Sequence, residues 1–144
     1  MTMKSKTILI AYPDELWNRS LSTFFHKLGY RVESARIVSG ILRKVRKGSI
    51  QVILLDDEIE GVRACDLVPL LKRNSKVQVI VISSEESLGL AKRLRGAGVF
   101  YHAMKPVDLE EIRSAVECAF EKIERESLKD EECFSFLVPR WVPA

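Results

Sequence analysis

The fold is decided by Gln51-Val52-Ile53-Leu54-Leu55-Asp56-Asp57-Glu58, an apolar run that ends abruptly in acidic residues. A strand that is covered on both faces is apolar throughout, whereas a half-exposed strand alternates. The run therefore predicts a strand over 51–55 in the interior of a parallel sheet. The carboxyl end of this strand presents Asp56, and we expect the side chain of Asp57 to point to the other side.

Four further segments are predicted as strands, three because they are short apolar runs and the segment 30–35 because its residues alternate. They are 7–11, 30–35, 77–82 and 99–103. Apolar residues at helical spacing lie between and after the strands. These stripes run over 17–28, 38–45, 67–71, 88–94 and 112–123. The order is (βα)5, which predicts an α/β fold with a doubly wound parallel sheet and right-handed crossovers.

Capping residues indicate where the helices begin. Asp14 and Asp108 precede the first and last stripes, and Glu111 completes a capping-box pattern with Asp108. The third helix contains Pro69, which is tolerated if Asp66 is the cap and the proline lies in the first turn.

The composition changes after the last stripe. We expect one domain over 6–124, followed over 125–144 by a charged linker and an apolar tail that begins at residue 133. The prolines of the tail argue against a helix there. A tail of this kind is expected to pack on its own domain, to extend the sheet edge of a neighbour or to enter a groove of a partner.

The composition is that of a globular domain and excludes several functions. Of the 144 residues, 47% are hydrophobic and 30% are charged, and the net charge is only +3. These values favour a real core and argue against wholesale binding to nucleic acid or membrane. The three cysteines lack CxxC spacing, so we expect free thiols in the cytoplasm. No loop has a glycine-rich pattern such as GxGxxG, which argues against a nucleotide-dependent enzyme.

Polar residues follow four of the predicted strands. In open parallel sheets, ligands bind outside the carboxyl ends of the strands. This rule selects Tyr12-Pro13-Asp14, Asp56-Asp57-Glu58, Ser83-Ser84 and Lys105-Pro106. The functional groups of the protein are therefore expected along one edge of the sheet.

Three segments make the chain resemble the receiver domains of response regulators, the CheY-like superfamily. They are 52–56, 80–84 and 98–106. The resemblance covers the chain from Lys6 to about Glu124 and implies a flavodoxin-like sheet with strand order 2-1-3-4-5. It also implies a function in two-component phosphorelay signalling, exerted through protein–protein contacts, and not a metabolic enzyme.

The resemblance implies roles for four residues. Asp56 matches the phospho-accepting aspartate, and Ser83 matches the hydroxyl residue that binds a phosphoryl oxygen. Lys105 matches the lysine that contacts the aspartate and then the phosphate, next to a proline joined by a cis bond, and His102 stands at the place of an aromatic switch residue. Each residue also has an ordinary structural interpretation. Asp56 would be an acid paired with Lys105, Ser83 a hydroxyl in a turn, and His102 a half-exposed strand residue.

The acidic pair that holds Mg²⁺ in this family is replaced by Tyr12 and Pro13. The remaining candidate ligands are Asp56, Asp14 and the backbone carbonyl of Glu58. Mg²⁺ usually takes one or two protein carboxylates, but Asp14 comes one residue late and is also the expected helix cap. Two interpretations stay open: a metal-free site, and a site in which Asp14 takes the place of the missing pair.

Two functions remain for a chain of this kind. In the first, Asp56 accepts a phosphoryl group from a histidine kinase or a phosphotransfer protein. In the second, the chain is a phosphorylation-independent pseudo-receiver that works as an adaptor or an oligomerisation module, for example as a homodimer. In both cases a downstream protein is expected on the face formed by 87–123 or on the tail, 133–144, with no role for nucleic acid or membrane.

Overall fold

A computed structural model describes residues 5–73 and 75–137, with side chains described up to residue 128. Its main sheet consists of β1 (Thr7–Ala11), β2 (Arg31–Ala35), β3 (Val52–Asp56), β6 (Gln78–Ser83) and β7 (Tyr101–Met104). All neighbours pair in parallel, in the order β2-β1-β3-β6-β7. This arrangement confirms the predicted order 2-1-3-4-5, because β4 and β5 form a separate hairpin.

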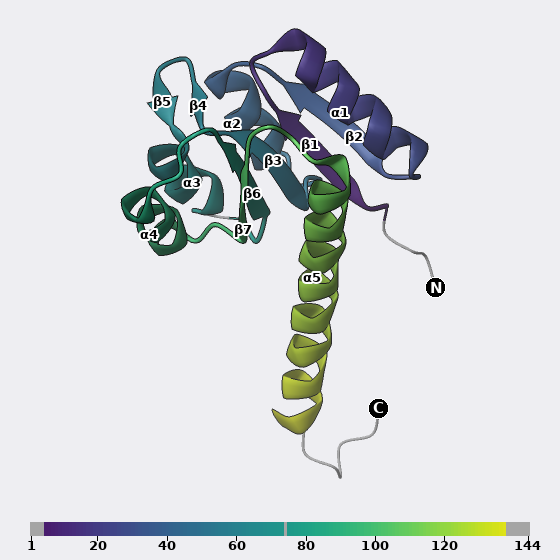
Figure 1. Ribbon diagram of the computed structural model, residues 1–144. Coiled ribbons are helices and arrows are strands. Elements are labelled where there is room, and N and C mark those ends of the chain that lie inside the picture. The colour runs from purple at the N-terminus through teal and green to yellow at the C-terminus, as the bar shows by residue number, and fades with distance from the viewer. Residues whose placement is uncertain (1–4, 74, 138–144) are drawn as a thin grey trace.

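Helices cover both faces of the sheet (Figure 1). One face packs against α1 (Glu15–Lys27) and α5 (Leu109–Leu137). The other face packs against α2 (Val38–Arg46), α3 (Ala64–Lys72) and α4 (Leu88–Ala97). The fold is therefore the doubly wound α/β architecture that the sequence predicts.

The central strand β3 is buried on both sides, which explains why its sequence does not alternate. Ile53 and Leu55 join the cluster of apolar residues under α2, α3 and α4, whereas Val52 and Leu54 join the cluster under α1 and α5. All of them are fully buried. Alternate residues of the apolar run thus pack into the two clusters on opposite faces of the sheet. The first polar side chain after the run, Asp56, lies at the edge of the sheet.

A hairpin follows β3 that the sequence analysis did not predict. It consists of β4 (Glu58–Ile59) and β5 (Val62–Arg63), which pair in antiparallel fashion. The two residues between them have positive φ, 53° at Glu60 and 78° at Gly61, as a two-residue type I′ loop requires. The carboxylate of Glu60 accepts a hydrogen bond of 2.6 Å from the backbone N–H of Val38, and so caps α2, whose own N-cap residue, Ile37, supplies no side-chain bond.

The hairpin also changes the beginning of α3. This helix starts at Ala64, so Asp66 lies inside its first turn and Pro69 lies further inside the helix. The prediction of Asp66 as the cap was therefore wrong. The chain passes from the hairpin directly into the helix. The N–H of Ala64 donates to the carbonyl of Asp57 at 2.9 Å, and this bond satisfies one of the N–H groups that have no partner within the helix.

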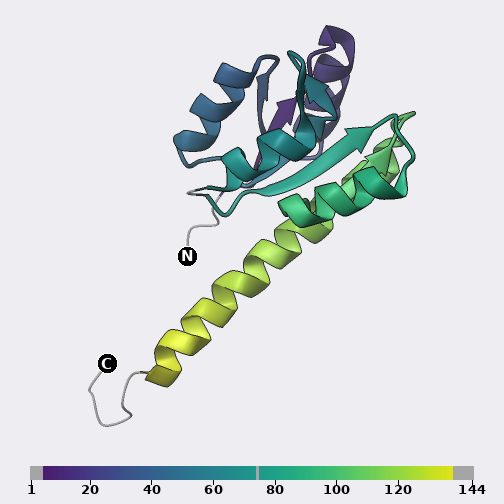
Figure 2. The same cartoon turned by 90° about the vertical axis from the view of Figure 1, so that its left-hand side faces the viewer.

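The last helix is longer than predicted. Helix α5 has 29 residues and ends at Leu137, whereas the predicted stripe ends at 123. It continues past the sheet (Figure 2). The prediction that 133–137 would not be helical was wrong because the prolines that supported it, at positions 139 and 143, come after the end of the helix. The rest of the predicted tail, 138–144, lies outside the described residues.

Candidate functional site

Three of the predicted site residues meet at the carboxyl edge of the sheet. Asp56 ends β3, Ser83 ends β6, and Lys105 follows β7. The ammonium Nζ of Lys105 lies 2.7 Å from Oδ1 of Asp56, and the backbone N–H of Lys105 donates to the carbonyl of Ser83 at 2.7 Å. The bond between Lys105 and Pro106 is cis, as the resemblance implies.

Burial and pairing act against each other in the ionisation of this site. Burial raises the pKa of Asp56, and the hydrogen bond and charge of Lys105 offset this rise only in part. Burial by itself lowers the pKa of Lys105, but the hydrogen bond to Asp56 and the surrounding groups outweigh it, so the pKa lies above its ordinary value. Lys105 therefore stays protonated at pH 7.

The side chain of Asp57 lies in the site, which corrects the prediction that it points to the other side. Its Oδ2 accepts hydrogen bonds from the hydroxyl of Ser83 and from the backbone N–H of Ser84, both at 3.3 Å. Its Oδ1 lies 3.7 Å from Nζ of Lys105. The alternation of side chains holds only within a regular strand, and β3 ends one residue earlier, at Asp56.

Tyr12 closes the site from the end of β1. Its side chain is buried, and the Nζ atom of Lys105 lies 5.5 Å from the centre of its ring, at cation–π distance. Burial and the charge of Asp56 raise the pKa of Tyr12, so the phenol is neutral at pH 7. The next residue, Pro13, accepts a hydrogen bond of 3.0 Å from Nε of Arg36 through its carbonyl oxygen. An aromatic ring and a backbone contact thus occupy the positions of the acidic pair.

The described residues show no clear Mg²⁺ site. Asp14 accepts a hydrogen bond of 3.0 Å from the N–H of Trp17, so its carboxylate serves as the cap of α1. Within 5–73 and 75–128, no three His, Cys, Asp or Glu side chains form a group that could hold a metal ion. Of the predicted ligands Asp56, Asp14 and Glu58, the carboxylate of Asp14 thus serves as a helix cap, and Lys105 supplies a positive charge beside Asp56.

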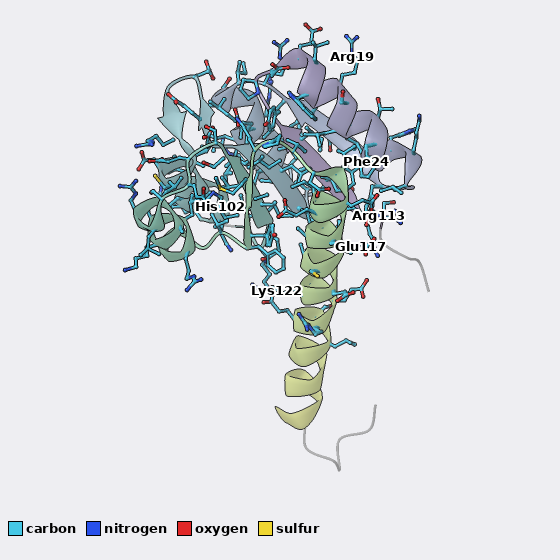
Figure 3. All side chains as sticks on the ribbon, in the orientation of Figure 1. Arg19, Phe24, His102, Arg113, Glu117 and Lys122 are labelled. Carbon is cyan, nitrogen blue, oxygen red and sulfur yellow. The ribbon has the colours of Figure 1, made fainter. Side chains whose placement is uncertain are left out.

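His102 lies on β7, three residues before Lys105 (Figure 3). Its side chain is half-buried, and its Nε2 atom meets no hydrogen-bond partner among the described residues. The neighbouring Tyr101 is exposed and donates a hydrogen bond of 2.8 Å from its hydroxyl to Glu111 on α5. The position of His102 agrees with the predicted place of a switch residue, and its role stays a prediction.

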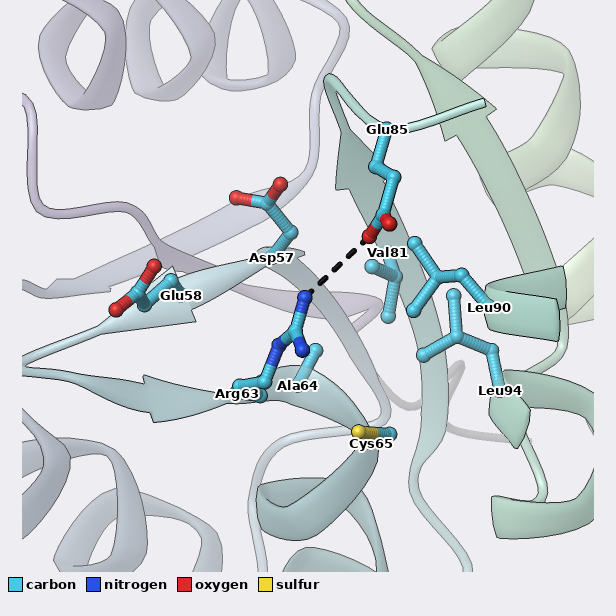
Figure 4. A pocket seen from close by; sticks show the side chains of 9 residues that line it. All are labelled: Asp57, Glu58, Arg63, Ala64, Cys65, Val81, Glu85, Leu90 and Leu94. Carbon is cyan, nitrogen blue, oxygen red and sulfur yellow. Dashed lines mark hydrogen bonds and ion pairs between the residues drawn. The ribbon is translucent and has the colours of Figure 1, made fainter. Parts of the chain in front are cut away.

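A small cavity of about 30 Å³ lies beside the site, between the hairpin and α4 (Figure 4). Asp57 and Cys65 are among the residues that line it. The guanidinium of Arg63 and the carboxylate of Glu85 pair at 3.3 Å, and this ion pair joins β5 to the loop after β6. A space of this size suits ordered water better than an organic ligand.

The sequence analysis missed Asn18, which organises the end of β1. Its side-chain amide is buried and donates to the carbonyls of Ile10, Tyr12 and Ala35, at 3.2, 2.9 and 3.3 Å. These bonds fix the backbone from which the ring of Tyr12 projects. The signal was present in the sequence, since Asn18 lies three residues before Leu21 and seven before Phe25, on the apolar stripe of α1.

We expect Lys105→Met to lower the free energy of unfolding by about 1–3 kcal/mol at pH 7. The variant leaves the carboxylate of Asp56 in the site without its cation. Removal of one partner costs about 3–5 kcal/mol in a fully buried pair, and the loss here is smaller because the Lys105 side chain is 32% exposed. Urea unfolding of both proteins measures the difference.

The pH dependence of this loss identifies its cause. The folded-state pKa of Asp56 is already raised, and removal of Lys105 raises it further. A carboxyl group with a raised folded-state pKa destabilises the folded state increasingly as the pH rises from its unfolded-state pKa to its folded-state pKa. The loss is therefore small at low pH and complete above the pKa of Asp56 in the variant. A pH-independent loss, or one that persists in Lys105→Met/Asp56→Asn, would contradict this explanation.

Comparisons with known proteins agree with this geometry. The family model described as the response regulator receiver domain matches residues 8–117. The DNA-binding transcriptional regulator NtrC of Azospirillum brasilense is 30% identical over 118 residues, which make up 81% of this chain and 24% of that protein. The sporulation initiation phosphotransferase F of Bacillus subtilis is 29% identical over 97 residues, 67% of this chain and 78% of that protein. The chain thus spans about a quarter of the length of the NtrC relative.

Solved structures support the same fold. A CheY-like receiver domain protein from Methanospirillum hungatei superimposes with a TM-score of 0.79 at 22% sequence identity, over 85% of this chain and 98% of that one. The protein is thus a doubly wound α/β signalling domain with an acid, a hydroxyl and a lysine at the carboxyl edge of its sheet. It belongs to the response regulator receiver domain family of two-component systems. Over the described part of the chain, none of the helices combines the length and apolar character that a bilayer crossing needs.

Proposed function

We propose that this receiver domain works as a protein-docking module whose conformation is set without a phosphoryl group. The observation that carries the proposal is the pairing inside the site. Lys105 binds Asp56 at 2.7 Å, and the hydroxyl of Ser83 donates to Asp57 at 3.3 Å. The hydroxyl that would respond to a phosphoryl group on Asp56 therefore already has an anionic partner in Asp57, whereas the pair of Lys105 and Asp56 is expected with or without phosphorylation.

The missing carboxylates support the same conclusion. Phosphoryl transfer needs positive charge on the transferred group, which a metal ion commonly supplies. Here Tyr12 and Pro13 offer no carboxylate, and Asp14 caps α1. Lys105 is the positive charge next to Asp56, and this lysine is held between Asp56, Asp57 and the ring of Tyr12.

The proposed docking face consists of α4, β7 and the first half of α5, which is about 87–123. It exposes the apolar side chains of Leu88 and Tyr101. Lys92, Arg93 and Arg95 lie exposed on α4. On α5, the carboxylate of Glu111 accepts a hydrogen bond of 2.8 Å from the hydroxyl of Tyr101. Apolar residues beside exposed basic ones suit a protein partner whose surface carries acidic residues.

A second function, phosphoryl acceptance at Asp56, is favoured by the gathering of Asp56, Ser83 and Lys105 at one edge. In that reaction a carboxylate oxygen of Asp56 forms a bond to phosphorus while the bond from phosphorus to a histidine nitrogen of a kinase or phosphotransfer protein breaks. The electron pair of the broken bond stays on the histidine nitrogen. One relative carries the name of a phosphotransferase, but that name describes the Bacillus protein.

Beryllofluoride, a mimic of the aspartyl phosphate, separates the two functions. We expect no change in the amide NMR signals of Asp56, Ser83 and Lys105 when beryllofluoride and millimolar Mg²⁺ are added to the protein. The physical reason is that the hydroxyl of Ser83 and the ammonium of Lys105 are already paired with carboxylates of the chain. Saturable shifts at these residues that disappear in Asp56→Asn would establish phosphoryl acceptance and contradict the proposal of docking without a phosphoryl group.

A further inference from the structure

Three donors from two strand ends converge on the carboxylate of Asp57. The hydroxyl of Ser83 and the backbone N–H of Ser84 both donate to Oδ2 at 3.3 Å. The ammonium of Lys105 lies 3.7 Å from Oδ1. A hydroxyl, an N–H and an ammonium in this arrangement form a cradle for an oxyanion, and Asp57 is the oxyanion that fills it.

The backbone holds Asp57 in this position. Its N–H donates to the carbonyl of Ile82 at 3.1 Å, and its carbonyl accepts from the N–H of Ala64 at 2.9 Å. The first bond ties the residue to β6, which also carries Ser83, and the second ties it to the beginning of α3. These two bonds therefore fix the main chain of Asp57 at the position from which its carboxylate reaches the three donors.

The surroundings offer Asp57 no better partner. Among the residues that line the adjoining cavity, the cation is Arg63, whose guanidinium pairs with Glu85 at 3.3 Å (Figure 4). Glu58, which also lines this cavity, is exposed and negatively charged. A carboxylate that left the cradle would thus move toward two other acids, so the cradle is its favoured place.

A phosphoryl group on Asp56 would need the same donors. It adds about −1.5 to −2 charges and three acceptor oxygens to the residue that precedes Asp57. The hydroxyl of Ser83 and the N–H of Ser84 each donate a single hydrogen, so a second anion would leave one of the two with unsatisfied oxygens, and the two anions would repel each other. The two groups therefore compete for Ser83, Ser84 and Lys105.

We infer that Asp57 is a built-in anion that occupies the oxyanion cradle of Ser83, Ser84 and Lys105 and regulates the site by excluding a phosphoryl group from it. The inference deepens the proposed function and rests on it, since it names the residue that keeps the responding groups paired. It assigns to Asp57 a role that its neighbour Asp56 does not share: Asp56 is the place where an anion would be attached, and Asp57 blocks the groups that would bind it.

The test is a beryllofluoride titration of the whole chain in Mg²⁺, followed by amide NMR, with the wild type compared to Asp57→Ala and Asp57→Asn. We expect saturable shifts at Ser83, Ser84 and Lys105 in Asp57→Ala, with an affinity roughly tenfold or more above that of the wild type. Asp57→Asn keeps the size of the side chain and removes its charge, so it decides the question if Asp57→Ala does not fold. Asp56→Asn/Asp57→Ala is the matched control, because it has the open cradle but no attachment point.

The outcomes separate this inference from the proposed function. Binding by the Asp57 variants alone supports both. Binding by the wild type that becomes roughly tenfold or more tighter in the variants supports the role of Asp57 but overturns phosphorylation-independent docking. Absence of binding in all proteins overturns the role of Asp57 and leaves the docking function in place. Equal binding by wild type and variants overturns both.

Discussion

Replacement of Phe25 by alanine is expected to lower the free energy of unfolding by about 3–5 kcal/mol. The Phe25 side chain is fully buried and packs edge-on against the rings of Phe24 and Tyr30, with centroids 5.1 and 5.7 Å away. Tyr30 in turn stacks on Phe120 at 5.5 Å. The aromatic group thus joins α1 to α5, and its removal leaves a cavity between the two helices that rigid neighbours cannot fill.

Urea unfolding followed by circular dichroism measures this loss, and Leu16→Ala is the matched control. Leu16 lies on the same helix but its side chain is 73% exposed, so its truncation should change the stability by no more than about 0.5 kcal/mol. A loss of about 1 kcal/mol or less for Phe25→Ala would show that the contact between α1 and α5 does not depend on this ring.

Asn18→Leu is expected to lower the free energy of unfolding by about 2–4 kcal/mol. Leucine has a similar size but donates no hydrogen bond, so the carbonyl of Tyr12 is left without the amide that now contacts it at 2.9 Å. The carbonyls of Ile10 and Ala35 lose one of their donors as well. Each loss leaves a buried polar group less well satisfied, which costs more than an exposed bond would.

The same substitution should also disturb the site, which separates its effect from general destabilisation. Asn18 holds the backbone of Tyr12, and the ring of Tyr12 lies against Lys105. Side-chain NMR signals of Lys105 should therefore shift in folded Asn18→Leu and stay in place in Ser22→Ala. Ser22 lies one turn further along α1 and contacts Asn18 only at 3.4 Å. Unchanged stability in Asn18→Leu would mean that other groups satisfy these carbonyls.

The parts of the fold that could be predicted from the sequence depend on burial and on a regular backbone. The apolar run that ends at Leu55 predicts a strand buried on both faces, and the structure confirms it. Because parallel strands present their carboxyl ends at one edge, the meeting of Asp56, Ser83 and Lys105 also follows from the order of strands and helices.

The parts that could not be predicted depend on where regular structure stops. The direction of Asp57 is decided by a bend after β3 and by hydrogen bonds to Ile82 and Ala64, which no period in the sequence reveals. The strands of the hairpin at Glu60 and Gly61 have only two residues each, too few for an alternating pattern to reveal them. The extension of α5 has many charged residues, which are typical of a linker but are equally suited to an exposed helix, since Lys122 and Glu126 pair at 3.8 Å.

Helix α5 makes the molecule strongly anisotropic in solution. Its 29 residues correspond to a rod of about 44 Å, of which about half continues beyond the sheet (Figure 2). Such a particle tumbles faster about the rod axis than end over end. The N–H bonds of α5 lie along that axis, so their ¹⁵N relaxation should report a longer apparent correlation time than that of bonds lying across it, such as many in the sheet. Small-angle X-ray scattering should show the same asymmetry as a long tail in the distribution of interatomic distances.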